Sequence, residues 1–137
     1  MARFAIIAAV LALALGARAD TNVTVGKMTV DGQEVRELKC TLKNAGFLAL
    51  ATVVGALSKQ KKAFDACVPG GAAFQVEWKW DGGKAKDVVV AKSSAKGKNK
   101  CFAAAVAKAT STAEGTCSAI VLVGKAEAAG KAADGLK

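Results

Sequence analysis

The sequence predicts an α+β fold: an antiparallel sheet of about five strands with two helices on one face, in the order ββαββαβ, stapled by disulfides. Residues 22–42 and 73–91 alternate polar and apolar side chains around Asp-Gly or Gly-Gly turns, as hairpins do. Residues 45–67 and 96–109 repeat apolar side chains at three- and four-residue steps, as helices do. Four cysteines, an even number, can form two bridges.

Residues 1–19 have the pattern of a secretory signal peptide. Arg3 precedes an unbroken apolar run, and Ala17 and Ala19 provide the small residues of a cleavage site. An uncleaved membrane anchor is the weaker alternative, because the run is well short of the roughly 20 apolar residues that cross a bilayer. We therefore expect a mature chain that has no transmembrane segment and is periplasmic or secreted.

The mature chain is predicted to begin at Asp20. Intact-mass measurement or N-terminal sequencing of protein isolated from its native host checks this expectation. Recovery from the cytoplasm of a chain that still begins at Met1 would contradict export.

Basic residues outnumber acidic ones, at 20 Lys+Arg against 11 Asp+Glu. Loss of Arg3 and Arg18 with the signal leaves 18 against 11, or +7, and all 18 except Arg36 are lysines. Lysine is a flexible, strongly hydrated point charge, whereas base reading favours arginine, and stacking platforms need more aromatic residues than this chain has. We therefore expect no nucleic-acid binding. The lysines act either as a solubilising coat or as an attraction for anionic polymers or lipid headgroups.

The first predicted hairpin joins strands over residues 22–30 and 33–42 through a two-residue Asp-Gly turn. The inward-facing apolar residues of its second strand do not keep a strict alternation, since Val35 is followed by Leu38 and Cys40. This spacing predicts a bulge or bend between Val35 and Leu38.

Residues 45–67 predict the first helix. Its apolar stripe consists of Phe47, Leu50, Val54, Leu57 and Phe64. The most apolar part, residues 47–57, has a length that suits a buried core helix better than a membrane span. Pro69 and the two glycines after it end the helix, because proline cannot continue one.

The clearest strand covers residues 73–80, and its partner, after a glycine turn, covers residues 84–91. One face of the first strand carries an aromatic ladder of Phe74, Val76, Trp78 and Trp80. Such a ladder can bind a sugar or a peptide, but at this spacing it is more often the core face beneath a helix.

Ser93 or Ser94 is predicted to cap a second helix over residues 96–109, and residues 116–123 form the last strand. Residues 20–124 then make a single domain. Residues 125–137, rich in Ala, Gly and Lys, offer no core-forming side chain except Leu136 and are predicted to be a flexible tail.

A weak anion site is predicted where the second helix begins. Ser94, Lys96, Lys98 and Lys100 would place free backbone N–H groups and three cations around a phosphate, sulfate or carboxylate. The alternative is a solvated loop with the helix starting later, and it is the favoured one of the two.

The cysteines are predicted to form structural disulfides in an oxidising compartment. Cys67 ends the first helix and Cys101 begins the second, and two helices side by side on one sheet can bring these positions together. Cys40 and Cys117, each on a strand, then pair with one another. The chain has no His, so a Cys/His metal site and a Cys-His nucleophile pair are excluded, and we expect no metal and no cofactor.

The segment from Leu57 to Val123 resembles the TonB C-terminal-like domains of bacterial envelope proteins, particularly the AgmX/PglI-type C-terminal domains of gliding myxobacteria. The likeness lies in Cys67 at the end of a helix, the strand over residues 73–80, a glycine turn, a Val-rich strand, and a helix bearing Cys101. The resemblance implies a noncatalytic adaptor that engages other envelope proteins, in some cases by adding a strand at a sheet edge. The chain departs from the pattern in lacking a membrane helix after cleavage and a long Pro-rich spacer, and in having extra cysteines at Cys40 and Cys117.

The acidic residues are scattered singly among lysines, and the glycine pairs lack the spacing of nucleotide-binding loops. We therefore expect no enzyme. The predicted function is an exported interaction or structural protein of the bacterial envelope, with an envelope protein as its partner. The alternative is a secreted, lysine-rich binder of anionic polymer or lipid headgroups.

Overall fold

The computed structural model describes residues 20–43, 46 and 48–136. The predicted signal peptide, residues 1–19, lies outside them, as does the predicted beginning of the first helix at Ala45. Among the described residues, no helix combines the length and the apolar character needed to span a membrane.

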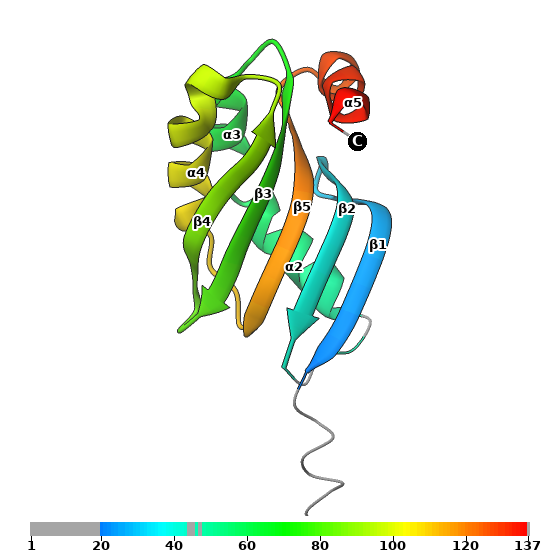
Figure 1. The fold of residues 1–137 in the computed structure, drawn as a ribbon, viewed down its shortest axis with the longest axis vertical. Coiled ribbons are helices and arrows are strands. Elements are labelled where there is room, and N and C mark those ends of the chain that lie inside the picture. Colours follow the sequence, from blue (N-terminus) through cyan, green and yellow to red (C-terminus); the bar gives the residue numbers. More distant parts are fainter. Residues whose placement is uncertain (1–19, 44–45, 47, 137) are drawn as a thin grey trace, which may run out of the picture.

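The described residues form a five-stranded antiparallel sheet, as the sequence predicts (Figure 1). Its strands are β1 (Thr21–Val30), β2 (Gln33–Leu42), β3 (Ala72–Asp81), β4 (Lys84–Ser93) and β5 (Gly115–Val123). Their spatial order is β1-β2-β5-β3-β4, so the last strand lies between the two hairpins and β1 and β4 are the edges. The predicted α+β class is confirmed.

The predicted irregularity in β2 is confirmed. The pairing of β2 with β5 shifts register between Arg36 and Lys39, and Glu37 has a φ of 51°. A bulge at this point returns Leu38 to the face that Val35 occupies, although the two residues are three positions apart. Both side chains are buried in the core.

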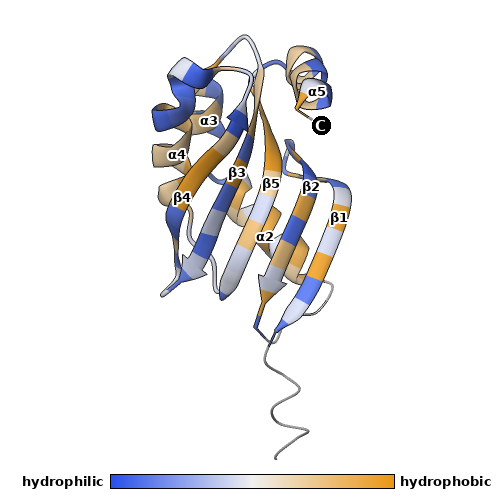
Figure 2. Ribbon diagram, viewed as in Figure 1, coloured by the Kyte–Doolittle hydropathy of each residue, from blue (hydrophilic) through white to orange (hydrophobic). Residues whose placement is uncertain are grey.

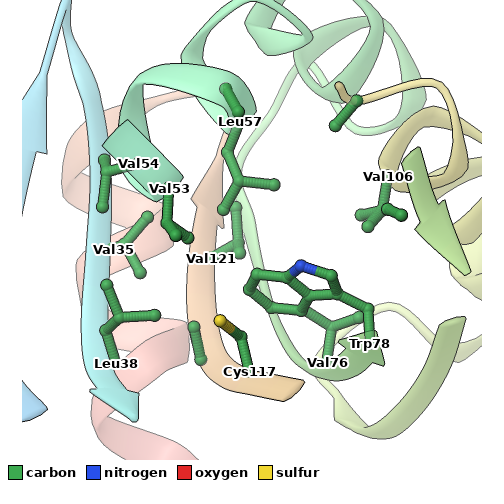
Figure 3. Close-up of a cluster of buried hydrophobic side chains, with 14 of the residues drawn as sticks. Val35, Leu38, Val53, Val54, Leu57, Val76, Trp78, Val106, Cys117 and Val121 are labelled. Atoms are coloured by element: carbon green, nitrogen blue, oxygen red, sulfur yellow. The ribbon is translucent and has the colours of Figure 1, made fainter. Parts of the chain in front are cut away.

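The inner face of the sheet carries the main core (Figure 3). The aromatic ladder of β3 faces inward, and Phe74, Trp78 and Trp80 are buried. Phe102 stands edge-on to both Phe64 and Phe74, with ring centroids 4.9 and 4.3 Å away. Of the two interpretations of the ladder, the core face beneath the helices is therefore the correct one.

Two helices occupy the place where one was predicted. They are α2 (Leu48–Ser58) and α3 (Lys61–Cys67), and between them Gln60 has φ −97° and ψ 6°, in the bridge region. Apolar periodicity alone did not reveal this break, because the apolar side chains keep a helical spacing across it. The break redirects the chain so that α3 packs on α4, while α2 packs on β1 and β2.

The second predicted helix also begins later than expected. A single 3₁₀ turn, η1 (Lys96–Lys98), precedes α4 (Asn99–Ala107). Gly97 and two flanking lysines disfavour an α-helical first turn, because glycine costs backbone entropy and cations oppose the helix dipole there.

The prediction of a flexible tail over residues 125–137 is wrong for most of that segment. Residues Ala126–Gly135 form helix α5, which lies on the outer face of the sheet, opposite the other helices (Figure 1). Its alanines fill a second, smaller core, which consists of Ala73, Ile120, Leu122, Ala129 and Ala133. Alanine has the highest helix propensity and no bulk to signal burial, so composition suggested disorder where a close-packed helix forms.

The two helical segments that the sequence predicted share one face of the sheet, as expected, and the additional helix α5 covers part of the other face (Figure 1). Arg36, the one arginine among the described residues, reinforces the contact: its Nη1 lies 3.1 Å from a carboxylate oxygen of Asp134 and 3.5 Å from the carbonyl oxygen of Gly130. The outer face is therefore covered at one end and open at the other.

Candidate functional site

Both predicted disulfides are present. Cys40 pairs with Cys117 directly across β2 and β5, with Cα atoms 4.1 Å apart, and both residues are buried. Cys67 at the end of α3 pairs with Cys101 in the first turn of α4, with Cα atoms 5.9 Å apart. Cys101 is exposed to solvent, so one bridge lies in the core and the other reaches the surface.

Three of the backbone amides on which the predicted anion site depended are engaged within the protein. The backbone N–H and the hydroxyl of Ser94 are both engaged with Ala73 on β3, at 3.1 and 3.0 Å. The N–H of Ala95 donates to the hydroxyl of Ser93, and that of Lys98 donates to the carbonyl oxygen of Ala95. Lys96, Lys98 and Lys100 are exposed next to this turn, where the amides of Ser94, Ala95 and Lys98 are already engaged. The favoured alternative, a helix that starts later, agrees with this geometry.

The open end of the outer sheet face holds a shallow groove of about 600 Å³. Its polar lining comes mainly from alternate residues of β1, β2, β5 and β3, with Asp87 from β4. The hydroxyl of Thr41 donates to Asn22 Oδ1 at 2.7 Å. The lining includes two lysines, Lys39 and Lys79, and two acidic residues, Glu77 and Asp87. The groove can hydrogen-bond a polar ligand, but its charges balance, and sequence reasoning did not identify it.

Within the described part of the chain, no three His, Cys, Asp or Glu side chains come together as a possible metal-binding group. The acidic side chains that form ion pairs do so mainly with basic residues that are close to them in the sequence. Examples are Asp65 with Lys61 at 2.7 Å and Glu34 with Arg36 at 2.6 Å. Asp65 also accepts a hydrogen bond from the backbone N–H of Gly124, so its role is to join α3 to the end of β5.

The two edges of the sheet differ sharply. β4 carries three lysines and has a bulge at Asp87 with φ 53°. Lysines and bulges are usual means by which proteins prevent an edge strand from pairing further. A helix packs against each edge strand, α4 against β4 and α2 against β1, so the helices do not distinguish the two edges. β1 has ten residues, a single lysine and no proline. It is the less protected edge.

Backbone groups of β1 face outward at known positions. The short Cα separation of Cys40 and Cys117 is that of a non-hydrogen-bonded pair, so the N–H and C=O of Cys40 point toward its β1 partner, Val23. Because successive residues of a strand alternate in direction, the N–H and C=O of Asn22 and Thr24 point away from the sheet. The half-buried side chains of Val23 and Val25 lie beside this free edge, above α2.

Comparison of this chain with protein-family models, with curated proteins and with solved structures finds no match in any of the three.

Proposed function

We propose that the chain is an exported, non-enzymatic interaction protein of the bacterial envelope that receives an extended segment of a partner protein along β1. The observation that carries this proposal is the contrast between the two edges: β4 is protected, and β1 is open over ten residues. An added strand would take up the outward N–H and C=O groups of β1, as in other cases of strand addition.

The side chains of β1 support the same mode of binding. Val23, Val25, Met28 and Val30 alternate with polar residues, apart from one extra residue at Gly26, and are only partly buried against the core. Apolar side chains of an added strand would cover their exposed sides. Two disulfides in a domain of this size are typical of an oxidising compartment, which supports export. The resemblance to TonB C-terminal-like domains stays a prediction and is consistent with an adaptor role.

Replacing Thr24 by proline is expected to block strand addition and leave the sheet intact. Proline removes one outward N–H and places its ring at the edge, but takes no hydrogen bond from the β1–β2 pairing. With a photoreactive residue at Asn22 in cells of the native host, we expect a cross-link to one extended protein segment. Thr24→Pro should lower its yield about tenfold, in line with the loss of one backbone hydrogen bond and its contacts.

Thr24→Val is the matched control, because valine keeps the N–H and suits a strand. It should leave the cross-link unchanged. A cross-link of equal yield with Thr24→Pro, or one formed only by a probe at Val89 on the opposite edge, would contradict docking at β1. Absence of any protein adduct at Asn22 would contradict a protein partner at this edge.

A further inference from the structure

The net positive charge of the protein is concentrated along one side. Residues 84–108, which form β4, η1 and α4, contain seven lysines and one acidic residue, Asp87, a net charge of +6. The rest of the chain from Asp20 onward has 11 basic and 10 acidic residues, a net charge of +1. A uniform solubilising coat would not have this distribution.

The fold turns two stretches of sequence into one continuous feature. α4 packs along β4, and Lys84 forms an isolated bridge with Thr110 just after α4. Lys84, Lys86 and Lys108 therefore lie toward one end of this side, and four lysines lie toward the other: Lys92, Lys96, Lys98 and Lys100. We call these seven residues the lysine stripe. Figure 2 shows hydrophilic segments at both ends of β4 and where η1 leads into α4.

The stripe is long and its charges are available. From Lys84 to Lys92 the strand extends about 26 Å, at roughly 3.3 Å per residue. All seven lysines are exposed, and among the described residues only Lys86 has an ion-pair partner, Asp81 at 3.6 Å. Exposed like charges gathered along one edge of the sheet raise the local concentration of a polyanion.

We propose that the lysine stripe binds an extended anionic polysaccharide, one that repeats carboxylate or other acidic groups along its chain. This site is on the opposite edge of the sheet from β1 and does not depend on the proposed protein partner. Lysine ammonium groups are mobile point charges, so they suit a flexible chain with repeated charge better than one ion of fixed geometry. The engaged amides beside Ser94 also argue against a site for a single small anion.

Two other polyanions fit the stripe less well. A membrane surface is flat and is usually joined by apolar anchors, but along this side Val89 is the one exposed large apolar side chain, at 56 %. Nucleic acid is generally bound with arginines and exposed aromatic rings, and the segment has neither, since Phe102 is buried.

The test uses polygalacturonate as the probe, as long chains and as dimers, with binding measured by calorimetry at several salt concentrations. Long chains should bind at least tenfold more tightly per chain than dimers. The logarithm of the association constant should fall linearly with the logarithm of the salt concentration. Two triple variants address the two ends: Lys84/Lys86/Lys108→Gln and Lys92/Lys96/Lys98→Gln. Each should weaken binding of long chains about tenfold and flatten the salt dependence.

The control variant Lys59/Lys62/Lys125→Gln removes the same charge from exposed positions elsewhere and should bind almost as wild type does. Thermal unfolding establishes that all three variants fold. Equal losses in the control would overturn the stripe in favour of a diffuse coat, and dimers binding as tightly as long chains would overturn an extended site. Tighter binding to phosphatidylglycerol vesicles or to duplex DNA than to polygalacturonate would overturn a polysaccharide ligand.

Thr24→Pro should not change polygalacturonate binding. The two proposals can therefore be contradicted independently, polysaccharide binding by the calorimetric measurements and strand addition at β1 by the cross-linking experiment.

Discussion

Replacing Gly115 by alanine is expected to destabilise the protein by about 4 kcal/mol or more, which is a large part of the stability of a domain of this size. A Cβ atom at this position would collide with the backbone carbonyl oxygen of Thr41 and lie 3.0 Å from Leu42 Cα. The residue also has a φ of 134°, which side chains other than glycine rarely tolerate. Backbone atoms cannot move aside as a flexible side chain can.

The position explains the size of the effect. Gly115 begins β5, where this last strand enters between β2 and β3, and it pairs with Leu42 on one side and Trp80 on the other. Displacing it disturbs the pairing of both hairpins with the central strand.

Urea unfolding followed by tryptophan fluorescence measures this, because Trp78 and Trp80 are both buried. Gly26→Ala on β1 is the matched control: it has no positive φ, and a Cβ there meets no atom within 4 Å. It should change stability by less than about 1 kcal/mol. An equal shift of the unfolding midpoint in the two variants would contradict the steric argument.

Local pattern predicted the local structure well. Alternation with glycine turns predicted both hairpins, and the irregular spacing of Val35 and Leu38 predicted the bulge, because each signal lies within a few residues. The position of β5 between the hairpins depends on contacts between distant segments, which periodicity does not encode. The need for glycine at position 115 follows from that placement, so it was equally hidden.

Alanine-rich segments were the main source of error. A stripe of alanines is apolar but small, so it is typical both of a flexible tail and of a helix packed closely on a sheet. In α5 the second case holds, because Ala129 and Ala133, one helical turn apart, pack with Ile120 and Leu122. What decides between the two is the apolar outer surface at this end of the sheet, which only the assembled strands reveal.

The candidate sites were partly visible in the sequence. Lys96, Lys98 and Lys100 were identified from their proximity in sequence, but as a local anion cradle, and the engaged backbone does not support that interpretation. Their association with the lysines of β4 needs the packing of α4 along that strand. The open edge of β1 could not be predicted either, since it depends on which strand stands outermost.

The two disulfides are expected to differ in two properties: how much each contributes to stability, and how easily each is reduced. The bridge between Cys40 and Cys117 joins residues 77 apart in sequence, and the bridge between Cys67 and Cys101 joins residues 34 apart. Loop-closure entropy then gives about 4.5 and about 3.8 kcal/mol as their contributions to the free energy of unfolding. Core packing adds to the contribution of the Cys40–Cys117 bridge, because its replacement by two alanines leaves a gap where buried sulfur atoms were.

Urea unfolding of the double variants Cys40/Cys117→Ala and Cys67/Cys101→Ala, with Cys101→Ser as a check on the exposed position, measures the two losses. The first double variant should lose more stability. A larger loss from the second would show that the junction of α3 and α4, and not the centre of the sheet, limits stability.

Reduction should follow the opposite order to stability, for a separate physical reason. A thiolate must reach a sulfur atom to open a bridge, and Cys101 is exposed whereas Cys40 and Cys117 are both buried beneath the helices. Graded reduction of the native protein, followed by alkylation and peptide mass mapping, should therefore label Cys67 and Cys101 first. Cys40 and Cys117 should become labelled only under conditions that unfold the sheet. Early labelling of Cys40 in folded protein would mean that the sheet opens between β2 and β5, and would contradict a rigid central strand.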